Sequence, residues 1–176
     1  MIKGPFLALT SLHLGSNDDI SPVLLDAFLA GFTPIIQKLW LVGISVLALP
    51  VLLLSSPSLS ELYLIWIPHS GYISSQMMAI CLSLLTMLKC LHIKFHSLNH
   101  SPDQISQSPP PLTHVVLPAL KMFVYHRVSE YLDVLMAQIN APLLNNIDMT
   151  FFHQLIFNIP QLPQFINYTG NFASPK

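Results

Sequence analysis

The stretch that decides how the fold is read runs from Leu39 to Leu88: LWLVGISVLALPVLLLSSPSLSELYLIWIPHSGYISSQMMAICLSLLTML. Glu61 is the only Asp, Glu, Lys or Arg in it. This residue separates an uncharged run of 22 residues, 39–60, from one of 27 residues, 62–88. A helix needs about 20 apolar residues to cross a hydrocarbon core of roughly 30 Å. Both runs are long enough, and they predict two transmembrane helices.

The alternative is a pair of buried helices in the core of a globular protein, but such helices are usually shorter and carry a polar stripe. Composition favours the membrane, because 52% of the residues are hydrophobic and 9% are charged, against about 25% charged in an average globular domain. The net charge of −1 is spread along the chain without a basic patch. We therefore expect no nucleic-acid partner.

We predict an all-α membrane protein, made of a two-span transmembrane helical hairpin, an amphipathic helix and an extended tail. Lys38 and Trp40 are residue types that anchor the start of a span, and Pro50 should kink the first span. We detect no internal repeat at the periods typical of solenoids. The predicted segments are an N-terminal part with a short interfacial helix (1–38), the hairpin (39–98), a Pro/Ser-rich linker (99–112), the amphipathic helix (113–148) and an aromatic tail (149–176).

The region after the linker leaves one alternative open, which is a third span at about residues 112–128. Such a span would bury His114 and Lys121, which is costly unless they line a protein interior. Apolar residues such as Tyr131 and Leu135 fall on one side of a helix, with Glu130 opposite. We therefore favour an amphipathic helix that lies at the interface or packs on a partner.

A possible metal site follows the second run. His92, His96 and His100 are spaced four residues apart, so they would share one face of a continuing helix. Histidines at this spacing can bind one transition metal, and Asp103 could add a ligand. The alternative is a histidine face that meets lipid headgroups or a neighbouring subunit.

A second set of histidines could bind a redox cofactor. Paired axial histidines on membrane helices are what haem b requires, and His69, His114 and His126 are candidates for haem or quinone binding. His126 lies between Tyr125 and Arg127, which would suit a quinone or a haem propionate.

Enzyme motifs are absent from the chain: it has no G-x-S-x-G elbow, H-E-x-x-H helix, P-loop or G-x-G-x-x-G turn. Cys81 and Cys90 lie nine residues apart in the apolar region and would point to opposite sides of a helix. We expect no catalytic residue, and we interpret both thiols as packing residues.

The predicted function is that of a small integral-membrane accessory or structural subunit in a larger complex, with an energy-transducing assembly (respiratory chain or ATP synthase) as the leading candidate. The expected location is a mitochondrial or other organelle inner membrane, and the expected partners are other membrane subunits and lipid. The physical reason is that 176 residues in this arrangement cannot bury all of their apolar surface. The alternatives are an anchor subunit with haem or quinone ligands and a metal-dependent membrane enzyme that uses the histidine cluster.

Overall fold

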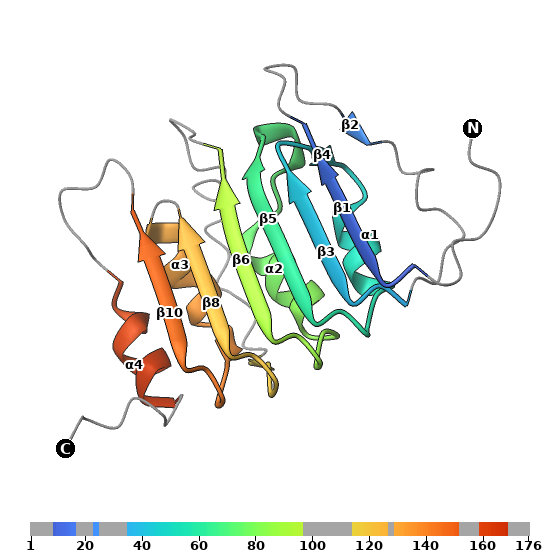
Figure 1. Cartoon of the computed structure of the whole chain (residues 1–176). Helices are drawn as coiled ribbons and strands as arrows, with labels where there is room; N and C mark the ends of the chain where they lie inside the picture. Colours follow the sequence, from blue (N-terminus) through green and yellow to red (C-terminus); the bar gives the residue numbers. More distant parts are fainter. Residues whose placement is uncertain are drawn as a thin grey trace.

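A sheet of six parallel strands forms the body of the molecule (Figure 1). The computed structural model describes residues 9–16, 23–24, 35–96, 114–126, 129–151 and 159–168. Each strand pairs with the next one along the chain, in the order β1-β3-β5-β6-β8-β10. The strands are β1 (Ser11–Gly15), β3 (Lys38–Val42), β5 (Glu61–Ile67), β6 (Cys90–Phe95), β8 (Met122–His126) and β10 (Asn146–Thr150).

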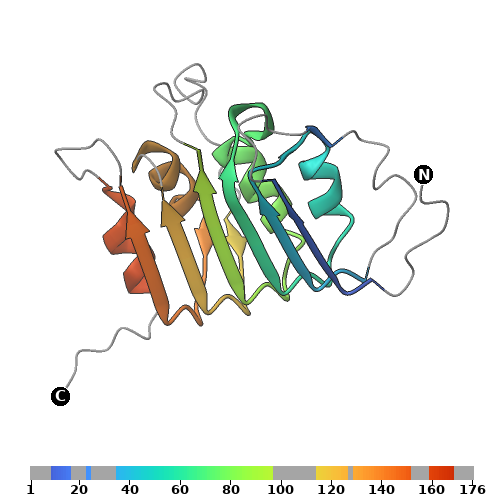
Figure 2. The same ribbon diagram turned by 45° about the horizontal axis from the view of Figure 1, so that its top comes forward.

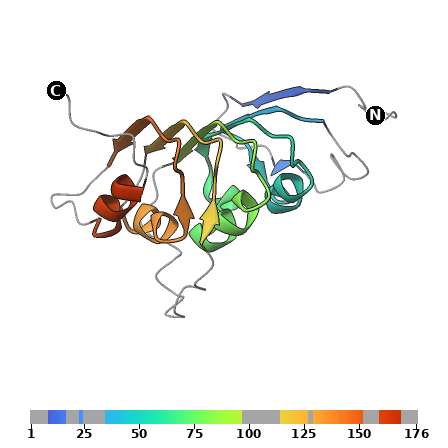
Figure 3. The ribbon, with the colours of Figure 1, turned by 90° about the horizontal axis from the view of Figure 1, so that it is seen from below.

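The described helices and short strands between these six strands lie along one face of the sheet, so the described part of the molecule has two layers (Figures 2 and 3). The described helices lie in the second layer, and none of them covers the opposite face, which we call the open face. The helices are α1 (Leu49–Leu54), α2 (Ser75–Leu82), α3 (Ser129–Met136), α4 (Gln161–Tyr168) and the 3-10 helix η2 (His69–Gly71). Two small parallel sheets pair β2 (Val23–Leu24) with β4 (Ser45–Val46) and β7 (Val115–Val116) with β9 (Ile139–Asn140).

Each of the six strands, with the two residues that precede it, forms an equivalent unit in the sheet. The first residues of the strands pair in register and lie 23 to 32 residues apart along the chain. Because this spacing varies, the sequence shows no repeat at a fixed period, although the strands occupy equivalent positions in the sheet. These first residues are Ser11, Lys38, Glu61, Cys90, Met122 and Asn146.

Each unit places three apolar residues at the same positions, in the pattern apolar-x-x-apolar-x-apolar. The recurrence of this pattern at each of the six strands is typical of repeat architectures. All three residues are buried in the four inner units, and they form the core between the two layers. The sets are Leu9, Leu12, Leu14; Ile36, Leu39, Leu41; Leu59, Leu62, Leu64; Leu88, Leu91, Ile93; Leu120, Phe123, Tyr125; and Leu144, Ile147, Met149.

The two predicted transmembrane helices are not formed, and the all-α fold class is wrong. The run 39–60 contains most of β3 together with β4 and α1, and the run 62–88 contains most of β5 together with η2 and α2. Among the described residues, the longest helices have eight residues, and none is long and apolar enough to cross a membrane. The predicted integral-membrane location and the predicted role as a membrane accessory subunit depend on these two spans. Because the spans are not formed, both predictions are contradicted.

Local signals explain why the apolar runs break into short elements. Pro50 lies at the start of α1 rather than kinking a long helix, and the first turn is where a proline is tolerated. Ser74 caps α2, because its Oγ accepts a hydrogen bond from the backbone N–H of Met77 at 3.2 Å. These signals start new helices inside segments that hydropathy alone joins together.

The remaining predicted segments also differ from the structure. The region 113–148 contains β7, β8, α3, β9 and the first part of β10 in place of one amphipathic helix. Within it, α3 buries Tyr131 and Leu135 and exposes Glu130, as its helical phase requires. The tail contains the short helix α4, whose first backbone N–H, at Gln161, donates to Asp133 Oδ1 of α3 at 3.1 Å. The linker 99–112 and most of the predicted interfacial helix lie outside the described residues.

Candidate functional site

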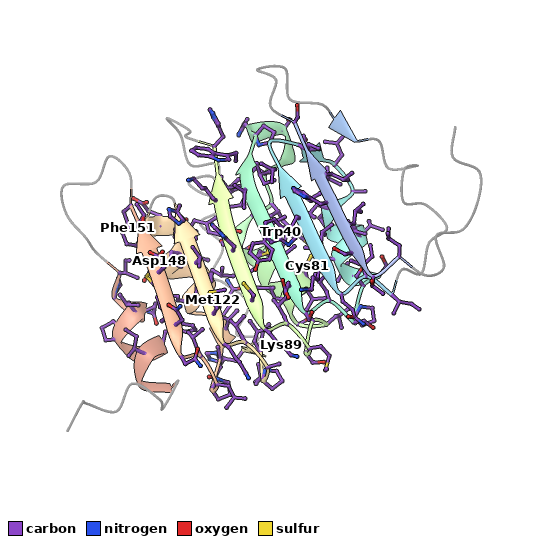
Figure 4. All side chains as sticks on the ribbon, in the orientation of Figure 1. Trp40, Cys81, Lys89, Met122, Asp148 and Phe151 are labelled. Atoms are coloured by element: carbon purple, nitrogen blue, oxygen red, sulfur yellow. The ribbon has the colours of Figure 1, made fainter. Side chains whose placement is uncertain are left out.

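Aromatic and imidazole rings cross the open face from strand to strand. His13, Trp40, Tyr63 and His92 come from β1, β3, β5 and β6 and occupy the same register position. Their neighbouring ring centroids lie 5.6, 4.0 and 5.9 Å apart. We call these four residues the ring row. Figure 4 shows Trp40 on the face of the sheet turned toward the viewer.

The strand pairing produces this row. In each unit the residues on either side of the ring position belong to the buried pattern, so the ring itself must point to the opposite face. Parallel pairing in register then places equivalent residues of adjacent strands side by side. In β8 and β10 the equivalent positions are Val124 and Asp148, and the rings do not continue there.

His126 of β8 extends the ring row diagonally. Its ring stacks on that of His92, with centroids 5.6 Å apart and an interplanar angle of 25°. Burial lowers the pKa of His92, and the neighbouring His126 and Lys94 lower it further, whereas Asp148 acts in the opposite direction. Burial and Lys94 also lower the pKa of His126 against the effect of Asp148. Both imidazoles are therefore neutral at pH 7, and His92 Nε2 is buried without a hydrogen-bond partner among the described residues.

The open face carries little net charge at the amino ends of β3, β5 and β6. Lys38 Nζ and Glu61 Oε1 form an ion pair of 2.7 Å between β3 and β5. Cys90 Sγ donates a hydrogen bond to the Tyr63 hydroxyl at 3.3 Å, and burial raises the pKa values of both groups. Because the Cys90 thiol and the Tyr63 phenol stay protonated at neutral pH, neither is activated as a nucleophile or base.

A bulge adds a further ring at the carboxyl end of the sheet. The register between β5 and β6 shifts between Ile65 and Ile67, so Trp66 is an extra residue in its strand. Trp66 is 46% exposed. Lys94 Nζ lies 3.9 Å from the Trp66 ring centroid, and the His96 ring lies 6.2 Å away.

The predicted metal ligands are not placed on a helix. His92 lies within β6, and His96 follows its last residue, so the helical face that was to unite them does not exist. His100 lies outside the described residues. Among the described residues, no three His, Cys, Asp or Glu side chains are close enough to bind one metal ion. Metal binding that includes His100 stays a prediction.

The predicted haem or quinone ligands are distributed over separate parts of the molecule. His126 lies on the open face, whereas His69 is an exposed residue of η2. His114 precedes β7 and lines an open cavity of about 380 Å³ on the helical side, together with residues of α3 and α4 such as Met136 and Phe165. Cofactor binding at any of the three stays a prediction.

The residues that define the open face were given other roles on sequence alone. Trp40 is predicted as a membrane anchor, and Tyr63 and Trp66 fall in the second uncharged run, which is predicted as a transmembrane helix. The signal that could have identified Trp40 and Tyr63 is their position, since each lies between the second and third apolar residues of its unit. Comparisons of the chain with known protein families, with curated proteins and with solved structures found no match.

Proposed function

We propose that this chain is a recognition domain whose open face binds another protein. The observation that supports this most is the ring row, in which four consecutive strands each contribute one ring to the same face. Trp and Tyr are enriched among the residues that contribute most to protein–protein affinity. They offer a large contact area with little side-chain entropy to lose on binding.

Repeat architecture provides a second argument. Solenoids present an extended surface built from equivalent positions of successive units, and such surfaces commonly bind other proteins. A sheet face that met only water would be expected to carry mainly polar side chains. Here Trp40, Val42, Tyr63 and Ile65 make the central part of the open face apolar and only partly buried.

The charges favour a protein over a nucleic acid as the partner. Lys38 is already paired with Glu61, and His92 and His126 are neutral at pH 7. Nucleic-acid binding depends on several cations that contact successive phosphates. The described part of the open face offers no such set.

Co-purification with matched variants tests the proposal. The tagged chain is extracted from its own cells, and the bound proteins are compared for wild type, Trp40→Ala and Val51→Ala. Val51 is 67% exposed on α1, in the helical layer. Loss of a central aromatic residue should weaken binding of a partner by about 2 kcal/mol or more. A partner that binds the open face should therefore be missing from the Trp40→Ala sample.

The control decides which surface is used. A partner lost with Trp40→Ala but retained with Val51→Ala, at unchanged thermal stability of both variants, supports the open face. A partner retained with Trp40→Ala and lost with Val51→Ala would place recognition on the helical layer and contradict the proposal.

A further inference from the structure

Trp66 has an unusual backbone conformation. Its φ is +55°, and among the described residues it is the only one other than glycine with a positive φ. Large side chains rarely adopt this region, because the Cβ atom crowds the backbone. Bulges and strained residues of this kind are concentrated next to functional sites, where they redirect a side chain.

The strained backbone of Trp66 does not place its side chain in the hydrophobic core. Trp66 is 46% exposed and is not part of the buried core. Instead, the bulge places the indole beneath Lys94 Nζ, 3.9 Å from the ring centroid, with the His96 ring 6.2 Å away. We call Trp66, Lys94 and His96 the Trp66 cluster.

Lys94 brings an uncompensated charge to this cluster. Among the described residues, the ion pair within 4 Å is Lys38 with Glu61, and no carboxylate is this close to Lys94. The carboxylate of Asp148 acts electrostatically on His92 and His126, but it lies on β10, two strands away from Lys94 in β6. The Lys94 ammonium therefore lies over the Trp66 indole and is still able to bind an anion.

We propose that the Trp66 cluster anchors a peptide segment of the partner in which a carboxylate side chain lies next to an apolar side chain. This inference rests on the proposed function and names the chemistry of its ligand. The carboxylate binds Lys94, and the apolar side chain packs on the exposed part of the Trp66 indole.

One ammonium suits a single carboxylate better than a polyanion. Nucleic acids and anionic membrane surfaces are bound by several Lys or Arg side chains acting together. Lys94 is the only Lys or Arg among the described residues of β5 and β6. An apolar ring beside a single cation matches a short amphipathic peptide.

Random peptides displayed on phage are selected on the immobilised full chain, and the enriched peptides are synthesised for titration. The chain has two tryptophans, and both Trp40 and Trp66 lie at the open face, so intrinsic fluorescence reports on this region. Enriched peptides should share an Asp or Glu beside an apolar residue. Replacing that acid by its amide should weaken binding about threefold or more.

Variants of the chain link this loss to Lys94. Lys94→Met should weaken binding of the acidic peptide by a similar factor, and the variant should bind the acidic and amide peptides equally well. Lys89→Met is the matched control, because Lys89 is exposed immediately before the same strand, and it should bind as the wild type does.

Trp66→Gly separates a binding role from a structural one. Glycine accepts a positive φ without strain, so the urea midpoint should stay the same or rise while peptide binding falls about thirtyfold or more. A marked loss of stability in this variant would show that Trp66 is a packing residue and would overturn the inference.

The remaining outcomes distinguish the two proposals. Enriched peptides that lack a carboxylate and depend on Trp40, but not on Lys94 or Trp66, would overturn this inference and leave the proposed function standing. No enrichment, or binding that is insensitive to Trp40, Trp66 and Lys94 alike, would overturn both.

Discussion

Two residues with positive φ play opposite roles in this molecule. Gly43 (φ +67°) follows β3, and its backbone N–H donates to the Ile65 carbonyl oxygen at 2.9 Å. A Cβ atom at this position would lie 2.6 Å from the Ser16 carbonyl oxygen. Gly43 therefore serves the fold, whereas Trp66 adopts a similar φ with a large exposed side chain.

Gly43→Ala should reduce the free energy of unfolding by about 1–3 kcal/mol, because it adds both backbone strain and a contact with Ser16. Gly15→Ala is the control, since the nearest atom to a Cβ there would be the Val42 Cβ at 3.9 Å. Urea unfolding of both variants measures the difference. An equal loss of unfolding free energy in the two variants would contradict the strained, crowded position assigned to Gly43.

The stacked histidines should make stability depend on pH. The pKa values of His92 and His126 are lowered in the fold, so the unfolded chain, with histidine pKa values of about 6.5, binds protons more readily. Stability should be highest above pH 6.5, fall as the pH drops through 6.5, and stop falling below the lowered pKa values.

Urea unfolding at about pH 7.5 and about pH 5.5 measures this contribution. The loss of stability between the two should be smaller in a His92→Gln/His126→Gln variant than in the wild type. His69→Gln is the control, because it removes an exposed histidine of η2 and leaves the His92–His126 pair intact. An unchanged loss in the double variant would rule out these two imidazoles as its cause.

At the scale of elements, β3 and β5 explain why the sequence predicts membrane helices. A strand with one wet face alternates apolar and polar residues, but here the open-face residues, such as Trp40 and Tyr63, are apolar or aromatic as well. Exposed apolar residues on α1 and α2, such as Val51 and Ile80, lengthen the runs further. The hydropathy signal was real, but it came from two apolar faces rather than from two spans.

Part of the fold could nevertheless be predicted locally. The helical phase over Tyr131 and Leu135 is correct for α3, and the recurring apolar triplets were available in the sequence. Their variable spacing hid them, because the return segments differ in length. The His92–His126 pair and the Trp66 cluster could not be predicted, since both depend on the register between strands.

Adjacent residues of β5 should differ in their contribution to stability. Leu64 is fully buried in the core, whereas Ile65 is a half-buried residue of the open face. Leu64→Ala should cost about 2–5 kcal/mol, and Ile65→Ala about 1 kcal/mol, in urea unfolding. Equal costs would contradict the assignment of these residues to opposite faces of a strand.

For the whole molecule, the repeat arrangement predicts a gradient of stability. Each strand of a solenoid is held mainly by its neighbours, and β5 and β6 have paired strands and buried core residues on both sides. β1 and β10 are the end strands of the described sheet. Hydrogen exchange should be slowest for the amides of β5 and β6 and fastest for those of β1 and β10, and uniform protection would contradict this gradient.

The most direct measurement is a photocrosslink from the open face. A benzophenone side chain is introduced at the position of Tyr63 in one version of the full chain and at the position of Ile80 in another, and each is irradiated in its own cells. Ile80 is exposed on α2, in the helical layer. An adduct with another protein from position 63 and none from position 80 is the result expected if the open face binds a protein partner. An adduct from position 80 alone, or from neither position, would contradict it.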